Sequence, residues 1–147
     1  MSIFSNNWWV LLACFLISII TGDGGIFLIT WNASVWGTIF GVTARNAALV
    51  TYISPIIYIF VILLIVLPHV FLESLSYILG AISGGVISKS LRTKTKGFRT
   101  ILIYNIILFT LAVNVLILGG IVETYVLGNV KLYHEIIEKS LFVSWLI

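Results

Sequence analysis

The chain has 147 residues, of which 61% are hydrophobic and 9% charged, and its mean hydropathy is +1.19. Soluble domains carry about 25% charged residues, so water is not the main solvent of this chain. The composition excludes a cytosolic enzyme, a nucleic-acid-binding module and a disordered tail. It predicts an all-α, multi-pass helical membrane protein. The single cysteine, Cys14, has no partner in the chain for a disulfide bond.

Three long apolar segments define the predicted membrane passes. They cover residues 8–42, 56–88 and 100–127. At 1.5 Å per residue, each of the first two would extend to roughly 50 Å as a helix, against a hydrocarbon core of about 30 Å. Each also contains helix-weakening residues, at Gly22-Asp23-Gly24-Gly25 and at Pro68-His69. We therefore predict one transmembrane domain, 1–147, with broken helices at Gly22, Gly24 and Pro68.

The number of passes depends on the first of these breaks. If Gly22–Gly25 only bends a helix, the chain crosses the membrane three times. If it is a turn between two helices, the chain crosses four times, because residues 2–21 and 26–45 are each just long enough to span. The sequence leaves both alternatives open, and with them the side on which the N-terminus lies.

Five basic residues gather between the second and third segments without any acid. They are Lys89, Arg92, Lys94, Lys96 and Arg99. Cytoplasmic loops of membrane proteins are enriched in Lys and Arg, so we place the loop 89–99 in the cytoplasm. The charges could serve topology alone. Alternatively they could bind anionic lipid headgroups, to which each basic residue adds roughly 1 kcal/mol, or a protein partner.

A polar group is predicted within the second segment. His69 and Glu73 are four residues apart, so both side chains lie on one helix face, and Tyr77 continues it. A carboxylate at this depth costs several kcal/mol unless it is protonated or paired. We predict a polar core of Asn32, His69, Glu73 and Tyr77, with a hydrogen bond between His69 and Glu73 or with the Asn32 amide. The alternative is an ion- or proton-coupled site beside a broken helix.

Small residues spaced by four predict two helix-packing faces. Gly80 and Gly84 form a G-x-x-x-G step in the second segment, and Ala33, Gly37 and Gly41 form a similar stripe in the first. Residues without large side chains let helix backbones approach closely. We expect the two stripes to pack against each other, with contact between two copies of the chain as the alternative.

The residues do not form a catalytic or metal-binding pattern. His69 and His134 lie far apart with no H-E-x-x-H motif, and Asp23 is the lone aspartate. The serines have no G-x-S-x-G context, and no phosphate-binding loop or dinucleotide fingerprint is present. We therefore expect no enzymatic activity, no metal and no cofactor.

A set of short motifs resembles the stage II sporulation protein M family, and most closely its archaeal members. The motifs are Asn6-Asn7, Gly22-x-Gly24, Trp31-Asn32-Ala33-Ser34-Val35, Leu67-Pro68-His69, Glu73 and Gly84-Gly85. The family signature is usually P-H-G-x-x-E, and here Val70 stands in place of its glycine. The resemblance extends over about residues 6–127.

The resemblance implies a helical multi-pass membrane protein without known enzymatic chemistry. In spore-forming bacteria the family's namesake is a scaffold that holds cell-wall hydrolases at the septal membrane during engulfment. For this chain we expect a subunit or scaffold of a complex in the cell membrane. Its expected partners are membrane lipids and a second copy or other membrane proteins, and not nucleic acid. A small transporter or permease that uses the His-Glu-Asn cluster is the alternative.

Overall fold

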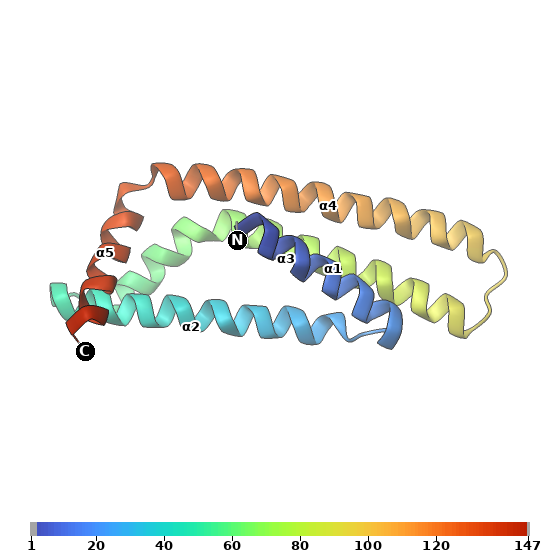
Figure 1. The fold of residues 1–147 in the computed structure, drawn as a ribbon, viewed down its shortest axis with the longest axis horizontal. Helices are drawn as coiled ribbons and strands as arrows, with labels where there is room; N and C mark the ends of the chain where they lie inside the picture. Colours follow the sequence, from blue (N-terminus) through green and yellow to red (C-terminus); the bar gives the residue numbers. More distant parts are fainter. Residues whose placement is uncertain (1–2, 147) are drawn as a thin grey trace. The chain divides into compact units, whose positions relative to one another are not determined.

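The computed structural model describes residues 3–146 of the chain. The described residues form five helices, α1 (Ile3–Thr21), α2 (Gly25–Thr51), α3 (Pro55–Arg92), α4 (Phe98–Asn129) and α5 (Lys131–Leu146) (Figure 1). The first four are long and apolar enough to cross a membrane. The prediction of an all-α, multi-pass membrane protein is confirmed, and α3 and α4 each extend a few residues beyond the predicted segments.

A tight turn at Gly22 separates α1 from α2, so the first predicted segment is two helices. Gly22 has a φ of +99°, the left-handed conformation in which glycine commonly ends helices. Its amide donates to the Ser18 carbonyl at 2.8 Å. The amide of Gly25 donates to the Ser18 hydroxyl at 3.1 Å, which satisfies one of the free amides at the start of α2. The chain therefore has four candidate membrane passes.

The predicted break at Pro68-His69 does not divide the segment into two helices. Helix α3 continues from Pro55 to Arg92 with Pro68 inside it. A proline removes one backbone hydrogen bond and crowds the preceding turn, but membrane helices tolerate it where packing and side chains compensate. The proline nevertheless lies at a boundary, because the chain divides into two compact units between Pro68 and His69.

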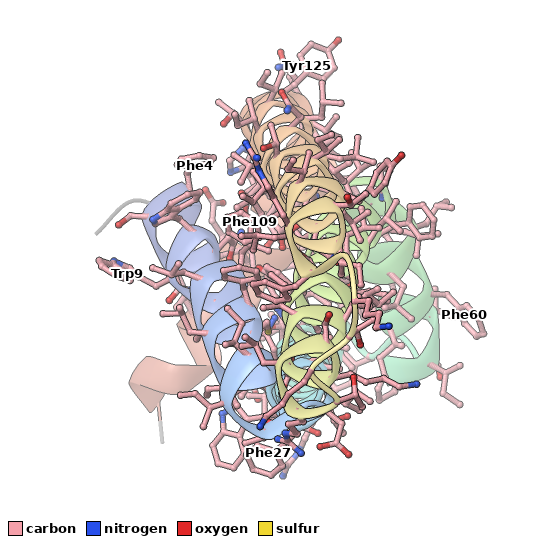
Figure 2. The ribbon with its side chains drawn as sticks, turned by 90° about the vertical axis from the view of Figure 1, so that its right-hand side faces the viewer. Phe4, Trp9, Phe27, Phe60, Phe109 and Tyr125 are labelled. Atoms are coloured by element: carbon pink, nitrogen blue, oxygen red, sulfur yellow. The ribbon has the colours of Figure 1, made fainter. Side chains whose placement is uncertain are left out.

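Unit 1 comprises Met1–Asn32 and His69–Gly120, and unit 2 comprises Ala33–Pro68 and Ile121–Ile147. The core of unit 1 is a cluster of buried side chains from α1, α3 and α4, namely Leu11, Cys14, Tyr77, Ala81, Ala112 and Leu116. The rings of Phe15 and Phe109 extend this core, with centroids 4.2 Å apart. Figure 2 shows Phe109 between α1 and α4, whereas Trp9 and Phe27 project outward, where a membrane would offer them lipid.

The glycines of α3 pack against the backbone of α1. A Cβ added at Gly84 would collide with the Phe15 carbonyl oxygen, and one added at Gly80 would lie 2.6 Å from Leu11 Cδ1. By contrast, a Cβ added at Gly37 or Gly41 would meet nothing within 4 Å among the described residues. The packing of the two stripes against each other stays a prediction, because Ala33, Gly37 and Gly41 belong to the other compact unit. The helix that packs closely against Gly80 and Gly84 is the apolar helix α1.

We predict that Gly84→Ala destabilises the protein by about 1–3 kcal/mol, because the new methyl group meets backbone that cannot rotate away. Gly37→Ala is the matched control, since it has open space around it and removes backbone freedom from a helix. Unfolding of the detergent-solubilised variants in SDS, followed by circular dichroism, measures both. Equal unfolding midpoints for the two variants would contradict the close α1–α3 contact.

In unit 2, the helix that begins at Gly25 continues well past the predicted end at residue 42, to Thr51. Its last turns are buried through Ala44, Ala47 and Ala48. The hydroxyl of Tyr58, on the following helix, donates to Thr51 Oγ1 at 2.9 Å. Small buried alanines and one hydroxyl contact thus hold α2 and α3 together around their short connection.

Helix α5 contains a tyrosine whose pKa is raised, first by burial and then by the nearby carboxylate of Glu123. Both effects disfavour the tyrosinate. Tyr133 consequently favours the native state while it is protonated. That contribution is fully present below the unfolded pKa of about 10, and it is lost as the pH rises through the higher folded pKa.

We predict that Glu123→Gln lowers the pKa of Tyr133 toward its ordinary value, because the carboxylate no longer opposes the tyrosinate. Ultraviolet titration of tyrosinate absorbance measures the shift, and Tyr133→Phe identifies which part of the curve belongs to this residue among the six tyrosines. An unchanged high-pH component in Glu123→Gln would show that Glu123 has no influence on Tyr133.

Candidate functional site

A row of buried polar side chains lies on one face of α3 in unit 1. His69, Glu73 and Tyr77 are spaced by four, and each is no more than 2% exposed. Ser76, beside them, is fully buried as well. The helical period places these residues together, as predicted. Because α3 does not break at Pro68, this row follows a continuous helix rather than a helix end.

A hydrogen-bond partner of Glu73 comes from α1. The side-chain amide of Asn7 donates to Glu73 Oε1 at 2.5 Å, and Asn7 is itself only 3% exposed. Asn7 was not among the predicted site residues. A signal for it exists in the sequence, because Asn7, Leu11, Cys14 and Ser18 recur at helical spacing, and all four are buried.

The backbone of α4 closes on the Glu73 side chain. A Cβ added at Gly119 would lie 3.4 Å from Glu73 Cγ and 3.3 Å from Leu72 Cβ. Glycine at this position thus lets α4 approach α3 beside the carboxylate. The Glu73 side chain thus lies between the Asn7 amide of α1 and the backbone of α4 at Gly119. These two contacts position the carboxylate and keep it away from lipid.

The other predicted members of the polar core have different surroundings. His69 is 1% exposed, and its Nδ1 has no hydrogen-bond partner among the described residues. Asn32 lies on α2 and is half-buried. The amide that contacts Glu73 is that of Asn7 rather than that of Asn32. Among the described residues, no three histidine, cysteine or acidic side chains are grouped to hold a metal ion.

The basic residues occupy the opposite end of α3 and the loop after it. Lys89 and Arg92 lie in the last turn of the helix, where they complement its negative dipole end. Lys94 and Lys96 lie in the connection 93–97, which is shorter than the predicted loop, and Arg99 lies in the first turn of α4. Arg92 Nη2 donates to the carbonyl of Ile20 at 2.9 Å, which joins the ends of α3 and α1 (Figure 1).

Comparison with known protein families gives one match that covers most of the chain. The model for stage II sporulation protein M matches residues 1–126. The chain belongs to the stage II sporulation protein M family. No curated protein and no solved structure matches it. Stage II sporulation protein M is not a known enzyme family.

We predict that Glu73→Gln is tolerated better than Glu73→Leu, because glutamine retains an oxygen that can accept from Asn7 whereas leucine leaves the amide unpaired. An unpaired buried polar group costs about 1–3 kcal/mol. Unfolding in SDS and the yield of folded protein from detergent compare the two variants. Equal and full yields would contradict a structural role for the carboxylate.

The pairing itself is tested by a double-mutant cycle of Asn7→Ala and Glu73→Gln. Residues in direct contact show coupling energies of about 0.5–3 kcal/mol. Asn114→Ala serves as the control in place of Asn7→Ala, because Asn114 is an exposed asparagine of α4 whose side-chain amide donates to the Thr110 carbonyl of its own helix. A coupling no larger than that of the control would exclude the hydrogen bond as a stabilising contact.

Proposed function

We propose that this protein is a non-enzymatic subunit or scaffold of a complex in the cell membrane. The observation that carries the proposal is the bond from Asn7 to the buried Glu73, which uses the costliest side chain of the membrane region to join α1 to α3. Gly119 packs α4 against the same acid. An acid held in this way serves helix assembly rather than catalysis.

The open face of α2 supports a protein partner. Ala33 and Gly37 are exposed, and the space around Gly37 and Gly41 is free of other described atoms for 4 Å. Small residues of this kind accept a second helix at short distance. We propose that another membrane protein, or a second copy of this chain, packs there.

We propose the membrane topology from the positions of the basic residues. The contact of Arg92 with Ile20 places the end of α1 at the same end of unit 1 as the basic loop. With that loop in the cytoplasm, the turn at Gly22 is also cytoplasmic, and the N-terminus of α1 is on the outer side. Helix α5, which follows the fourth pass, then lies outside.

A photoreactive residue at position 37 tests the proposal in native membranes. We expect the photoreactive residue at position 37 to form a discrete crosslinked protein adduct. The mass of this adduct identifies either a second copy of the chain or a different subunit. The same residue at position 107 is the control, because Ile107 is exposed on α4 and no small-residue stripe surrounds it. Lipid adducts alone at both positions would overturn the complex-forming role.

A small transporter or permease is the second candidate, favoured by the buried His69 Nδ1 that has no partner among the described residues one turn from Glu73. Proton or solute flux in proteoliposomes distinguishes the two functions. Glu73→Gln keeps an acceptor for Asn7 but cannot ionise. Flux that this variant abolishes and Asn114→Ala preserves would establish transport and exclude the purely structural role.

A further inference from the structure

Unit 1 contains a polar cavity where the α1–α2 turn meets the last turns of α3. Its volume is about 390 Å³. Both basic residues of the helix end, Lys89 and Arg92, line it, together with Ser88 and the turn residues Gly22 and Asp23. The cavity therefore lies at the level where the apolar helices give way to the charged loop, which is the headgroup level of a membrane.

One wall of this cavity carries a hydroxyl without a protein partner. Ser88 is 2% exposed, and its Oγ has no hydrogen-bond partner among the described residues. A Cβ added at Gly22 would lie 4.0 Å from Ser88 Oγ and 3.9 Å from Arg92 Nη2. The hydroxyl and the guanidinium thus converge on the space beside a glycine. A buried hydroxyl with no partner is costly unless a ligand satisfies it.

A second, apolar cavity adjoins the polar one and shares Gly22, Asp23, Gly85 and Lys89 with it. Its volume is about 380 Å³. The added lining is aliphatic except for Ser18, and its larger side chains are Ile26 and Ile29 of α2 and Ile78, Ile82 and Val86 of α3. The two cavities together run from a basic, hydroxyl-bearing end into a hydrocarbon-lined groove.

The charge of the polar end favours an anion. The lining contains two basic residues, Lys89 and Arg92, and one acid, Asp23. The charged residues of the connection that follows are all basic. Arg92 uses one nitrogen for the Ile20 carbonyl, and a guanidinium has five N–H donors in all. Lysine, arginine and hydroxyl donors are the groups that bind phosphate oxygens.

We propose that the two cavities form a binding site for one anionic phospholipid. Its phosphate is held by Ser88, Lys89 and Arg92, and one acyl chain lies in the groove between α2 and α3. The aliphatic groove favours a lipid over free phosphate, because a small anion would leave it empty. The net positive charge at the polar end favours a lipid whose headgroup does not neutralise its own phosphate.

Native mass spectrometry of the detergent-purified protein tests the site with phosphatidylglycerol and phosphatidylcholine of identical acyl chains. We expect one phosphatidylglycerol to be retained per chain and phosphatidylcholine to bind more weakly. Lys89→Gln should weaken phosphatidylglycerol about fivefold, the effect of one basic residue near an anionic headgroup. Lys96→Gln removes the same charge outside the cavity lining and should change binding little.

Matched pairs test the hydroxyl and the groove separately. Ser88→Ala should weaken binding, whereas Ser90→Ala should not, because Ser90 is also a buried serine without a partner but does not line the cavity. Ile82→Trp should fill the groove and displace the lipid. Ile103→Trp introduces the same ring at a similarly exposed position of α4, away from the groove.

Thermal unfolding without lipid shows whether each variant is folded. If a charge variant or a groove variant does not fold, the binding measured for Ser88→Ala still tests the site. Equal losses of phosphatidylglycerol binding in Lys89→Gln and Lys96→Gln would show that the lipid responds to general surface charge, and would overturn the proposed site. Equal binding of the two lipids would overturn the anionic preference. Complete competition by inorganic phosphate, with no effect of Ile82→Trp, would replace the lipid with a free anion and overturn the proposal.

Discussion

The hydrogen bond between Asn7 and Glu73 is the contact on which unit 1 depends most. A carboxylate between membrane helices must be compensated, and here the compensating group is an amide on a helix far away in the sequence. The requirement fixes how α1 lies against α3, because a shift along either helix would separate the two groups. A polar pair inside an apolar protein therefore provides specificity that hydrocarbon packing alone does not.

Glycine contacts complement this pair at two further levels of unit 1. Gly84 brings the backbones of α1 and α3 together, and Gly119 does so for α4 beside the acid. The buried amide sets which helices meet and in which register, and the missing side chains set how closely they meet. The amide–acid hydrogen bond and the glycine contacts both involve α1, α3 and α4. The apolar core of unit 1 and its polar cluster therefore depend on the packing of the same three helices.

Composition and segment length were enough to predict the fold class, because hydrophobic runs of this length have few other solutions. The glycines at Gly22–Gly25 indicated a change of chain direction because glycine adopts backbone conformations that interrupt a helix. Gly22 adopts such a conformation in the turn between α1 and α2. Pro68 does not divide its helix in two, because a proline weakens a helix locally while the rest of a long membrane helix persists. The partner of Glu73 could not be chosen from the sequence, since Asn7 and Asn32 offer identical chemistry and differ only in tertiary placement.

The short turn at Gly22 also bears on how the protein enters the membrane. Helices joined by so few residues cannot cross the bilayer in separate events, so α1 and α2 would be expected to insert together as a hairpin. Helix α1 carries no charged side chain, and Asp23 lies in the turn that joins it to α2. A charge introduced into α1 would therefore obstruct the insertion of this hairpin into the membrane as well as disturb the finished structure.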